Sequence, residues 1–324
     1  MIEFLLRRLA QSVFVLAAMA ALVFVGIYAV GSPIDMLVPP EADQIERARV
    51  VAQLGLDQPL YQQFLYFGLN LAHGDFGRSF VHNVSAMSLI VARLPATLEL
   101  AVFALLTAVI VGIPLGILAG LTAARPVGKA IVAGSILGFS IPNFWLGLTL
   151  IMLFAVKLQW LPAGGRGATR EIFGVEFSFL TVDGLAHLLL PALTLALFKI
   201  ALVTRLAYAG TREALTQEFV KFARAKGLSP GRIVRTHILK TILIPIVTVL
   251  GLEFGSMIAF AVVTETVFAW PGVGKLLIDS IGRLDRPVIV SYLILIAFIF
   301  VMINFLVDVM YSLLDPRIRL GGEK

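Results

Sequence analysis

The sequence predicts an all-α polytopic membrane protein with six transmembrane helices, and three observations support this fold class. Hydrophobic residues make up 59% of the 324 residues and the mean hydropathy is +0.95, which is too apolar for a soluble globular protein. Six apolar runs approach or exceed the ~20 residues that a helix needs to cross a bilayer core. Basic residues concentrate in the segments that alternating spans would place on one side of the membrane.

The first span follows a positively charged start, in which Arg7 and Arg8 precede an uninterrupted apolar run over residues 13–30. A signal peptide has the same order of charge and apolar residues, but this run is longer than a typical signal-peptide core. We therefore predict that residues 1–30 form a cytoplasmic start and an uncleaved first transmembrane helix.

Residues 31–95 contain no apolar run long enough to cross a membrane. A piece with acidic and basic residues at 41–53 and an amphipathic piece at 59–72 each predict a helix. Because the first span starts inside, this segment is expected to be periplasmic and to form a small ordered cap.

Residues 96–314 are predicted to form a core domain of five further spans, followed by a cytoplasmic tail at 315–324. Pro95 stands where a proline suits the first turn of the second span. Pro142 is expected to kink the third span. The five spans are expected over residues 97–121, 130–154, 185–208, 241–267 and 288–314.

Charge decides which side the loops occupy. The segments expected inside, with Lys199 and Arg205 from the inner half of the fourth span counted among them, hold sixteen Lys and Arg residues against five acidic residues, a net charge of +11. The segments expected outside have a net charge of −1, and four further acidic residues fall within the spans. Since positive charge favours cytoplasmic loops, both termini are predicted to be cytoplasmic. The overall charge of +6 is explained in the same way, so nucleic acid is not an expected partner.

A polar stretch from Thr211 to Pro245, here called the basic segment, lies between the fourth and fifth spans. An apolar stripe with helical spacing runs through it, formed by Leu215, Phe219, Phe222 and Ala223. Its basic residues are Arg212, Lys221, Arg224, Lys226, Arg232, Arg235 and Lys240. Gly227 is expected to end one short helix, and Ser229 followed by Pro230 to begin a second. A surface both apolar and cationic suits a groove on another protein or anionic lipid headgroups, so the segment is interpreted as a docking element.

Several kinds of chemistry are excluded or disfavoured. The chain has no cysteine, and its four histidines are scattered without the spacing of a metal motif. The sequence Pro271–Lys275 superficially resembles a phosphate-binding loop, but Ala269 and Leu276 occupy positions where that loop needs Gly and Ser or Thr. No catalytic, metal or cofactor site is therefore expected in this chain.

Four acidic residues fall within the expected spans, where an ionisable side chain is costly and often functional. Glu99 and Glu265 are expected near the outer ends of their spans, within reach of water, and Asp308 near an inner end. Only Glu253 is expected to lie deep. A hydrogen-bonded structural or interfacial role is expected for each, with Glu253 and Glu265 as the candidates for an acid on a pathway through the membrane.

The string KFARAKGLSPGRI at residues 221–233 resembles the EAA loop of permease subunits of binding-protein-dependent ABC importers. Within them it is most similar to the first (B-type) permease of the dipeptide, oligopeptide and nickel branch. Lys221 and Phe222 replace the motif's Glu and first Ala, whereas Ala223 and Gly227 match it. Further similar strings are LGLDQP at 54–59, GDFGRS at 74–79, LPATLEL at 94–100 and ETVFAWPG at 265–272.

The resemblance implies the type I importer permease (MetI-like) fold in the bacterial inner membrane, and half of a pathway for di- or oligopeptides. The implied partners are a second, related six-span permease, two ATPase subunits that bind ATP and Mg, a periplasmic or lipid-anchored substrate-binding protein and membrane lipid. Residues 209–240 would be the coupling loop that docks on an ATPase. The implied contact residues are Leu215, Phe219, Lys221, Phe222, Ala223, Arg224, Ala225, Lys226, Gly227, Leu228 and Ser229.

Other readings stay open. The same class of importer could carry a nickel chelate, glutathione or another small solute. A secondary carrier without ATPases is the alternative from another class, but its inverted repeats or charge relay are not visible in the sequence. A membrane enzyme is disfavoured because no constellation of nucleophile, base and metal ligands is present, and an exporter because no fused ATPase is present.

Overall fold

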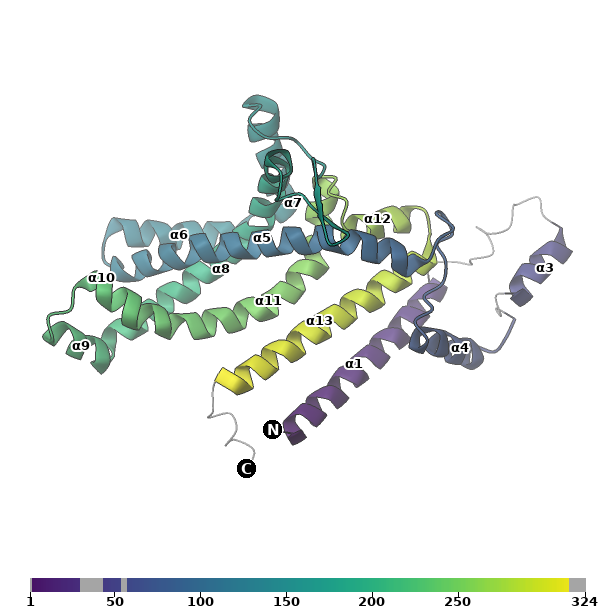
Figure 1. The fold of residues 1–324 in the computed structure, drawn as a ribbon, viewed down its shortest axis with the longest axis horizontal. Helices are drawn as coiled ribbons and strands as arrows, with labels where there is room; N and C mark the ends of the chain where they lie inside the picture. Colours follow the sequence, from purple (N-terminus) through teal and green to yellow (C-terminus); the bar gives the residue numbers. More distant parts are fainter. Residues whose placement is uncertain (1, 30–42, 54–56, 315–324) are drawn as a thin grey trace. The chain divides into compact units, whose positions relative to one another are not determined.

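The computed structural model describes residues 2–29, 43–53 and 57–314 of the chain (Figure 1). The chain divides into two units, Met1–Leu94 with Gly272–Lys324, and Pro95–Pro271. The predicted tail at 315–324 lies outside the described residues, as do residues 30–42.

The first unit is built from helices. Along the chain they are α1 (Ile2–Ala29), α3 (Gln44–Gln53), α4 (Leu60–Ala72), the beginning of α5 (Ala86–Leu121), α12 (Val273–Gly282) and α13 (Arg286–Leu314). Helix α1 packs along α13, and Phe24 of α1 contacts Phe64 and Phe67 of α4 at ring-centroid distances of 5.2 and 5.6 Å. The helices predicted at 41–53 and 59–72 are confirmed as α3 and α4. Helix α12 was not predicted, because ten residues after a Pro-Gly pair have the appearance of a loop.

A buried aspartate joins two distant parts of the first unit. Asp285, between α12 and α13, accepts hydrogen bonds from the Ser79 hydroxyl and from the Phe80 amide at 3.0 Å. Its exposure is only 1%. The segment that leads into α5 is therefore fastened to the start of α13.

The second unit contains the remainder of α5 and most other elements. They are α6 (Pro126–Ser140), α7 (Asn143–Leu150), η1 (Ile151–Lys157), β1 (Arg170–Ile172), β2 (Val175–Phe177), α8 (Val182–Thr216), α9 (Glu218–Ala225), α10 (Pro230–Ile233), η2 (Val234–Ile238) and α11 (Leu239–Val267). Strands β1 and β2 pair antiparallel with Arg170 opposite Phe177. The all-α prediction is thus right except for this hairpin in the segment before α8.

Glycines let α5 and α8 approach closely. A Cβ atom built on Gly116 would lie 2.4 Å from the Cβ of Ala207, and one on Gly112 would lie 2.8 Å from that of Val203. A side chain at either position would push the helices apart. Small residues at a helix interface allow this kind of close packing within the chain.

Among the residues that the structure describes, five helices are long and apolar enough to cross a membrane. A sixth span results if α6 and the α7–η1 pair, which are bent by 104° at Pro142, count as one. The predicted kink is therefore present and large, while six spans stays a prediction. The expected start of the second span was wrong: α5 begins at Ala86 and holds Pro95 inside. Burial of Ala86 and Ile90 stabilises the added turns, offsetting the backbone hydrogen bond that proline removes.

Candidate functional site

Most of the basic segment is continuous with the long helices on either side of it, whereas two separate short helices were predicted. Helix α8 continues to Thr216 rather than ending at Tyr208, and a single helix runs from Pro230 to Val267 through α10, η2 and α11. The expected second short helix is therefore the first part of the fifth span. Only α9 stands as a short helix of its own.

Helix α9 has well-defined ends. Gly227 adopts a left-handed conformation (φ +77°), its amide donates to the Arg224 carbonyl at 2.9 Å, and the Leu228 amide donates to the Ala223 carbonyl at 3.2 Å. These two bonds form a Schellman motif, which confirms Gly227 as the helix stop. Ser229 takes the predicted N-cap position before Pro230, although its side chain makes no capping hydrogen bond.

The residues of the predicted apolar stripe do not all face outward: some are buried in the chain's own core, and others are exposed. Val220 and Ala223 are buried in the hydrophobic cluster of the second unit, together with Ile233 and Ile238. Ala223 was expected to face a partner, but the chain's own core covers it. Leu215 lies on α8 and packs partly buried against the same cluster, so it does not extend a stripe on α9.

The outward side of α9 is aromatic and cationic. Phe219 and Phe222 are 40% and 62% exposed. Lys221, Arg224 and Lys226 are also exposed, and the Lys226 ammonium lies 4.6 Å from the centroid of the Phe222 ring. We call these five residues the α9 surface. Of the other residues predicted here, Ala225, Gly227 and Ser229 are exposed and Leu228 is partly buried. The α9 surface is held rigidly, because Val220 and Ala223 fix the opposite side of the helix.

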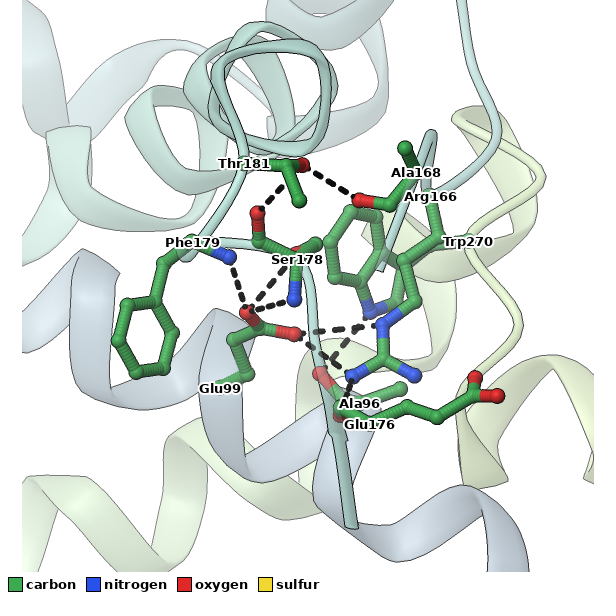
Figure 2. A network of polar contacts seen from close by, with 9 residues as sticks. All are labelled: Ala96, Glu99, Arg166, Ala168, Glu176, Ser178, Phe179, Thr181 and Trp270. Carbon is green, nitrogen blue, oxygen red and sulfur yellow. Dashed lines mark hydrogen bonds and ion pairs between the residues drawn. The ribbon is translucent and has the colours of Figure 1, made fainter. Parts of the chain in front are cut away.

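A second polar site surrounds Glu99 on α5 (Figure 2). Arg166 donates from Nη2 and Nε to Glu99 Oε2 at 2.8 and 3.2 Å. The other oxygen, Oε1, accepts from the Ser178 amide and hydroxyl at 2.8 Å and from the Phe179 amide at 2.9 Å. Glu99 was expected to reach water, but its side chain is only 1% exposed. The carboxylate instead fastens the segment between η1 and α8.

The same site includes the end of α11. Trp270 is fully buried and donates from Nε1 to the Ala96 carbonyl at 2.9 Å, and Arg166 lies 5.9 Å from its ring centroid. Glu265, also expected near water, is fully buried and accepts from the Thr97 hydroxyl at 2.5 Å. Sequence reasoning missed Arg166, and its setting between glycines gave no signal of a buried partner.

A third polar site joins the middles of α8 and α11. Lys199 forms an ion pair with Glu253 Oε2, and the Ser256 hydroxyl lies 3.1 Å from the same oxygen. Lys199 was grouped with the inner charges from sequence, so this pairing was not predicted. Within the part of the chain that the structure describes, no group of three His, Asp or Glu residues is placed to hold a metal ion.

Comparison with known proteins covers both ends of the chain. Residues 112–320 match the family described as binding-protein-dependent transport system inner membrane component, and residues 1–101 match the N-terminal family of such membrane components. The di/tripeptide transport system permease protein DppB of Pseudomonas aeruginosa is 38% identical, over 98% of this chain and 99% of its own length. The oligopeptide transport system permease protein AppB of Bacillus subtilis is 37% identical, over 98% of this chain and all of its own.

A solved structure shares the fold. A chain of the MetNI methionine ABC transporter in an inward-facing conformation superposes with a TM-score of 0.56 at 18% identity, covering 71% of this chain and 97% of that chain. At this identity the likeness concerns the fold alone.

Proposed function

The chain belongs to the family of inner membrane components of binding-protein-dependent transport systems, and from this premise we propose that it forms half of the pathway of an ATP-driven peptide importer. It is a multi-pass inner-membrane permease subunit without catalytic activity of its own. We propose six spans with both termini cytoplasmic, with α6 and α7–η1 counted as one bent span.

The α9 surface carries the proposal of energy coupling. Phe219 and Phe222 expose apolar area at the end of a span, and three cations surround them. Exposed aromatic residues on a rigid helix suit a cleft on another protein, and arginine or lysine at the rim suits acidic residues there. We propose that this cleft belongs to a separate ATPase, whose closure moves α9 and with it α8 and α11.

The remaining partners follow from the same proposal. Two ATPase subunits would bind ATP and Mg, and a periplasmic or lipid-anchored protein would deliver the substrate. A second, related permease would complete the pathway. The apolar windows of the candidate spans are between 6% and 56% buried within this chain, so they leave apolar surface for lipid and for that second permease.

Peptides are the proposed cargo because the two relatives carry di/tripeptide and oligopeptide in their names. Their identities to this chain, 38% and 37%, do not distinguish the two lengths of peptide. Glutathione, a nickel chelate or another small solute remains the alternative within the class.

Affinity purification of the tagged chain in mild detergent tests the proposal. Recovery of a second permease and ATPases, with ATP hydrolysis, supports it. Replacing Phe219 and Phe222 with Ala removes about 2 kcal/mol of apolar burial, when the value for a buried Phe is scaled by the exposed fractions. ATPase retention should then weaken about thirtyfold. The matched control replaces Phe14 and Phe144, exposed phenylalanines on α1 and α7, with Ala.

The outcomes separate the alternatives. A chain that purifies alone and moves solute in vesicles without ATP would refute the importer and indicate a secondary carrier. Normal ATPase retention by the Phe219 and Phe222 variant, with lost affinity for anionic vesicles, would assign the α9 surface to lipid headgroups.

A further inference from the structure

The ion pair between α8 and α11 is unevenly buried. The Lys199 side chain is 11% exposed, whereas that of Glu253 is 30% exposed. Lys199 and the Ser256 hydroxyl both lie at Oε2 of the carboxylate. The other oxygen, Oε1, has no hydrogen-bond partner among the described residues. One side of a mid-span carboxylate is therefore open.

The pair lies at membrane depth. Glu253 stands fourteen residues before the end of α11 at Val267, which corresponds to about 21 Å along the helix. Lys199 stands seventeen residues from each end of α8, or about 26 Å. The hydrocarbon core of a bilayer is about 30 Å thick, so both side chains fall within it.

The exposed side of the Glu253 carboxylate is not expected to face lipid tails. A part-exposed carboxylate at this depth is costly in hydrocarbon and generally faces a water-filled path or another chain. Leu252, adjacent to it in sequence, and Phe260, two turns further along α11, are also exposed, at 43% and 73%. A charged group among exposed apolar side chains suits contact with a polar ligand better than contact with lipid tails.

The pair is also not needed to hold the two helices together. Helices α8 and α11 already share an apolar cluster that includes Val203, Ala207, Ile246 and Leu250. Replacing a buried ion pair by apolar residues of similar size is often neutral or stabilising. A purely structural role would therefore leave the charge at this position unexplained.

Resting on the proposed peptide cargo, we propose that Glu253 contacts the free amino terminus of a peptide during its passage. Oε1 accepts a hydrogen bond from the cargo ammonium, while Lys199 holds Oε2 and orients the carboxylate. Charge-assisted hydrogen bonds of this kind are stronger than neutral ones and select for the charged partner. The pair thus adds a selection step for free amino termini within the membrane.

The test uses the complete transporter in vesicles and two peptides of one sequence, one with its amino group and one with hydrogen in its place. The substrate-binding protein is kept saturated with either peptide, as shown by direct titration, so that its preference does not enter. Wild-type transport should favour the free amino terminus. K199M/E253Q should reduce that preference roughly tenfold or more, as expected for loss of a hydrogen bond to a charged group.

E253Q alone would leave the Lys199 charge without its counterion and could disturb folding, so K199M is combined with it. The matched control is K275M/D279N, which removes an ion pair within α12. An unchanged preference in K199M/E253Q, with normal ATP hydrolysis, overturns the inference and leaves the importer standing. A wild-type complex that transports neither peptide refutes the proposed cargo itself, and the inference with it.

Discussion

Replacing Arg166 with Met tests whether the Glu99 site holds the segment between η1 and α8 in place. Methionine has a similar length but no charge and no donor. The substitution removes both hydrogen bonds to Glu99 Oε2, at 2.8 and 3.2 Å, and a third from Nη2 to the Glu176 carbonyl at 2.6 Å. It leaves a carboxylate that is 1% exposed without its counterion.

The expected loss of stability in R166M depends on the hydrogen bonds that Glu99 keeps. Breaking a buried ion pair by removing one partner costs about 3–5 kcal/mol. Because Glu99 Oε1 keeps its bonds from Ser178 and Phe179, we expect the lower end, about 3 kcal/mol. E99Q alone should also destabilise, because its amide would face the Arg166 donors. R166M/E99Q removes both the stranded charge and this conflict, so its cost should be smaller than the sum of the single variants.

The assay is equilibrium unfolding of the purified chain in mixed micelles, followed by tryptophan fluorescence. Trp270 is a built-in reporter, since its ring lies 5.9 Å from the Arg166 guanidinium carbon. Cleavage of the segment between η1 and α8 by added protease gives a second readout. An R166M cost below about 1 kcal/mol, or strictly additive costs in the double variant, would contradict the role assigned to the pair.

Two further substitutions test the close packing of α5 on α8 and the proposed coupling through α9. G116A places a Cβ 2.4 Å from that of Ala207 and should destabilise the membrane-inserted chain by about 1–3 kcal/mol. The control G134A, whose Cβ meets nothing within 4 Å, should be neutral or slightly stabilising. Equal thermal stability of the two purified variants would refute close α5–α8 contact. G227D should abolish uptake at normal membrane levels, because it adds an acidic side chain where an ATPase would approach and strains the left-handed residue (φ +77°) that ends α9. Surviving uptake would refute coupling through α9.

The sequence was sufficient to predict the helices whose apolar pattern is long or whose ends carry special residues. Gly227 was predictable as a helix stop because helices often end with a residue in the left-handed conformation, which glycine adopts without strain. The early start of α5 was not predictable, since it goes with the burial of Ala86 and Ile90, which no local pattern indicates. Tertiary packing there outweighs the local effect of Pro95.

The polar sites were harder to predict, because each one pairs residues far apart in the chain. Glu99 and Arg166 are separated by 67 positions, and Lys199 and Glu253 by 54. No local spacing signals such a pair. Single acidic residues in spans were recognised as unusual, but Glu99 and Glu265 were expected near water and are buried, which their positions in the sequence do not indicate.

Helix α8 gives the proposed coupling a physical route within the second unit. Its 35 residues extend about 52 Å, from the Thr181 cap beside the Glu99 site to Thr216 beside α9. At Gly112 and Gly116 the backbone of α5 lies directly against the Val203 and Ala207 side chains of α8, with no α5 side chain between them. A displacement of α9 would therefore move α8 and α5 together rather than bend one against the other. Because α11 shares a buried apolar cluster with α8, the same movement would carry the Lys199–Glu253 pair along with both helices.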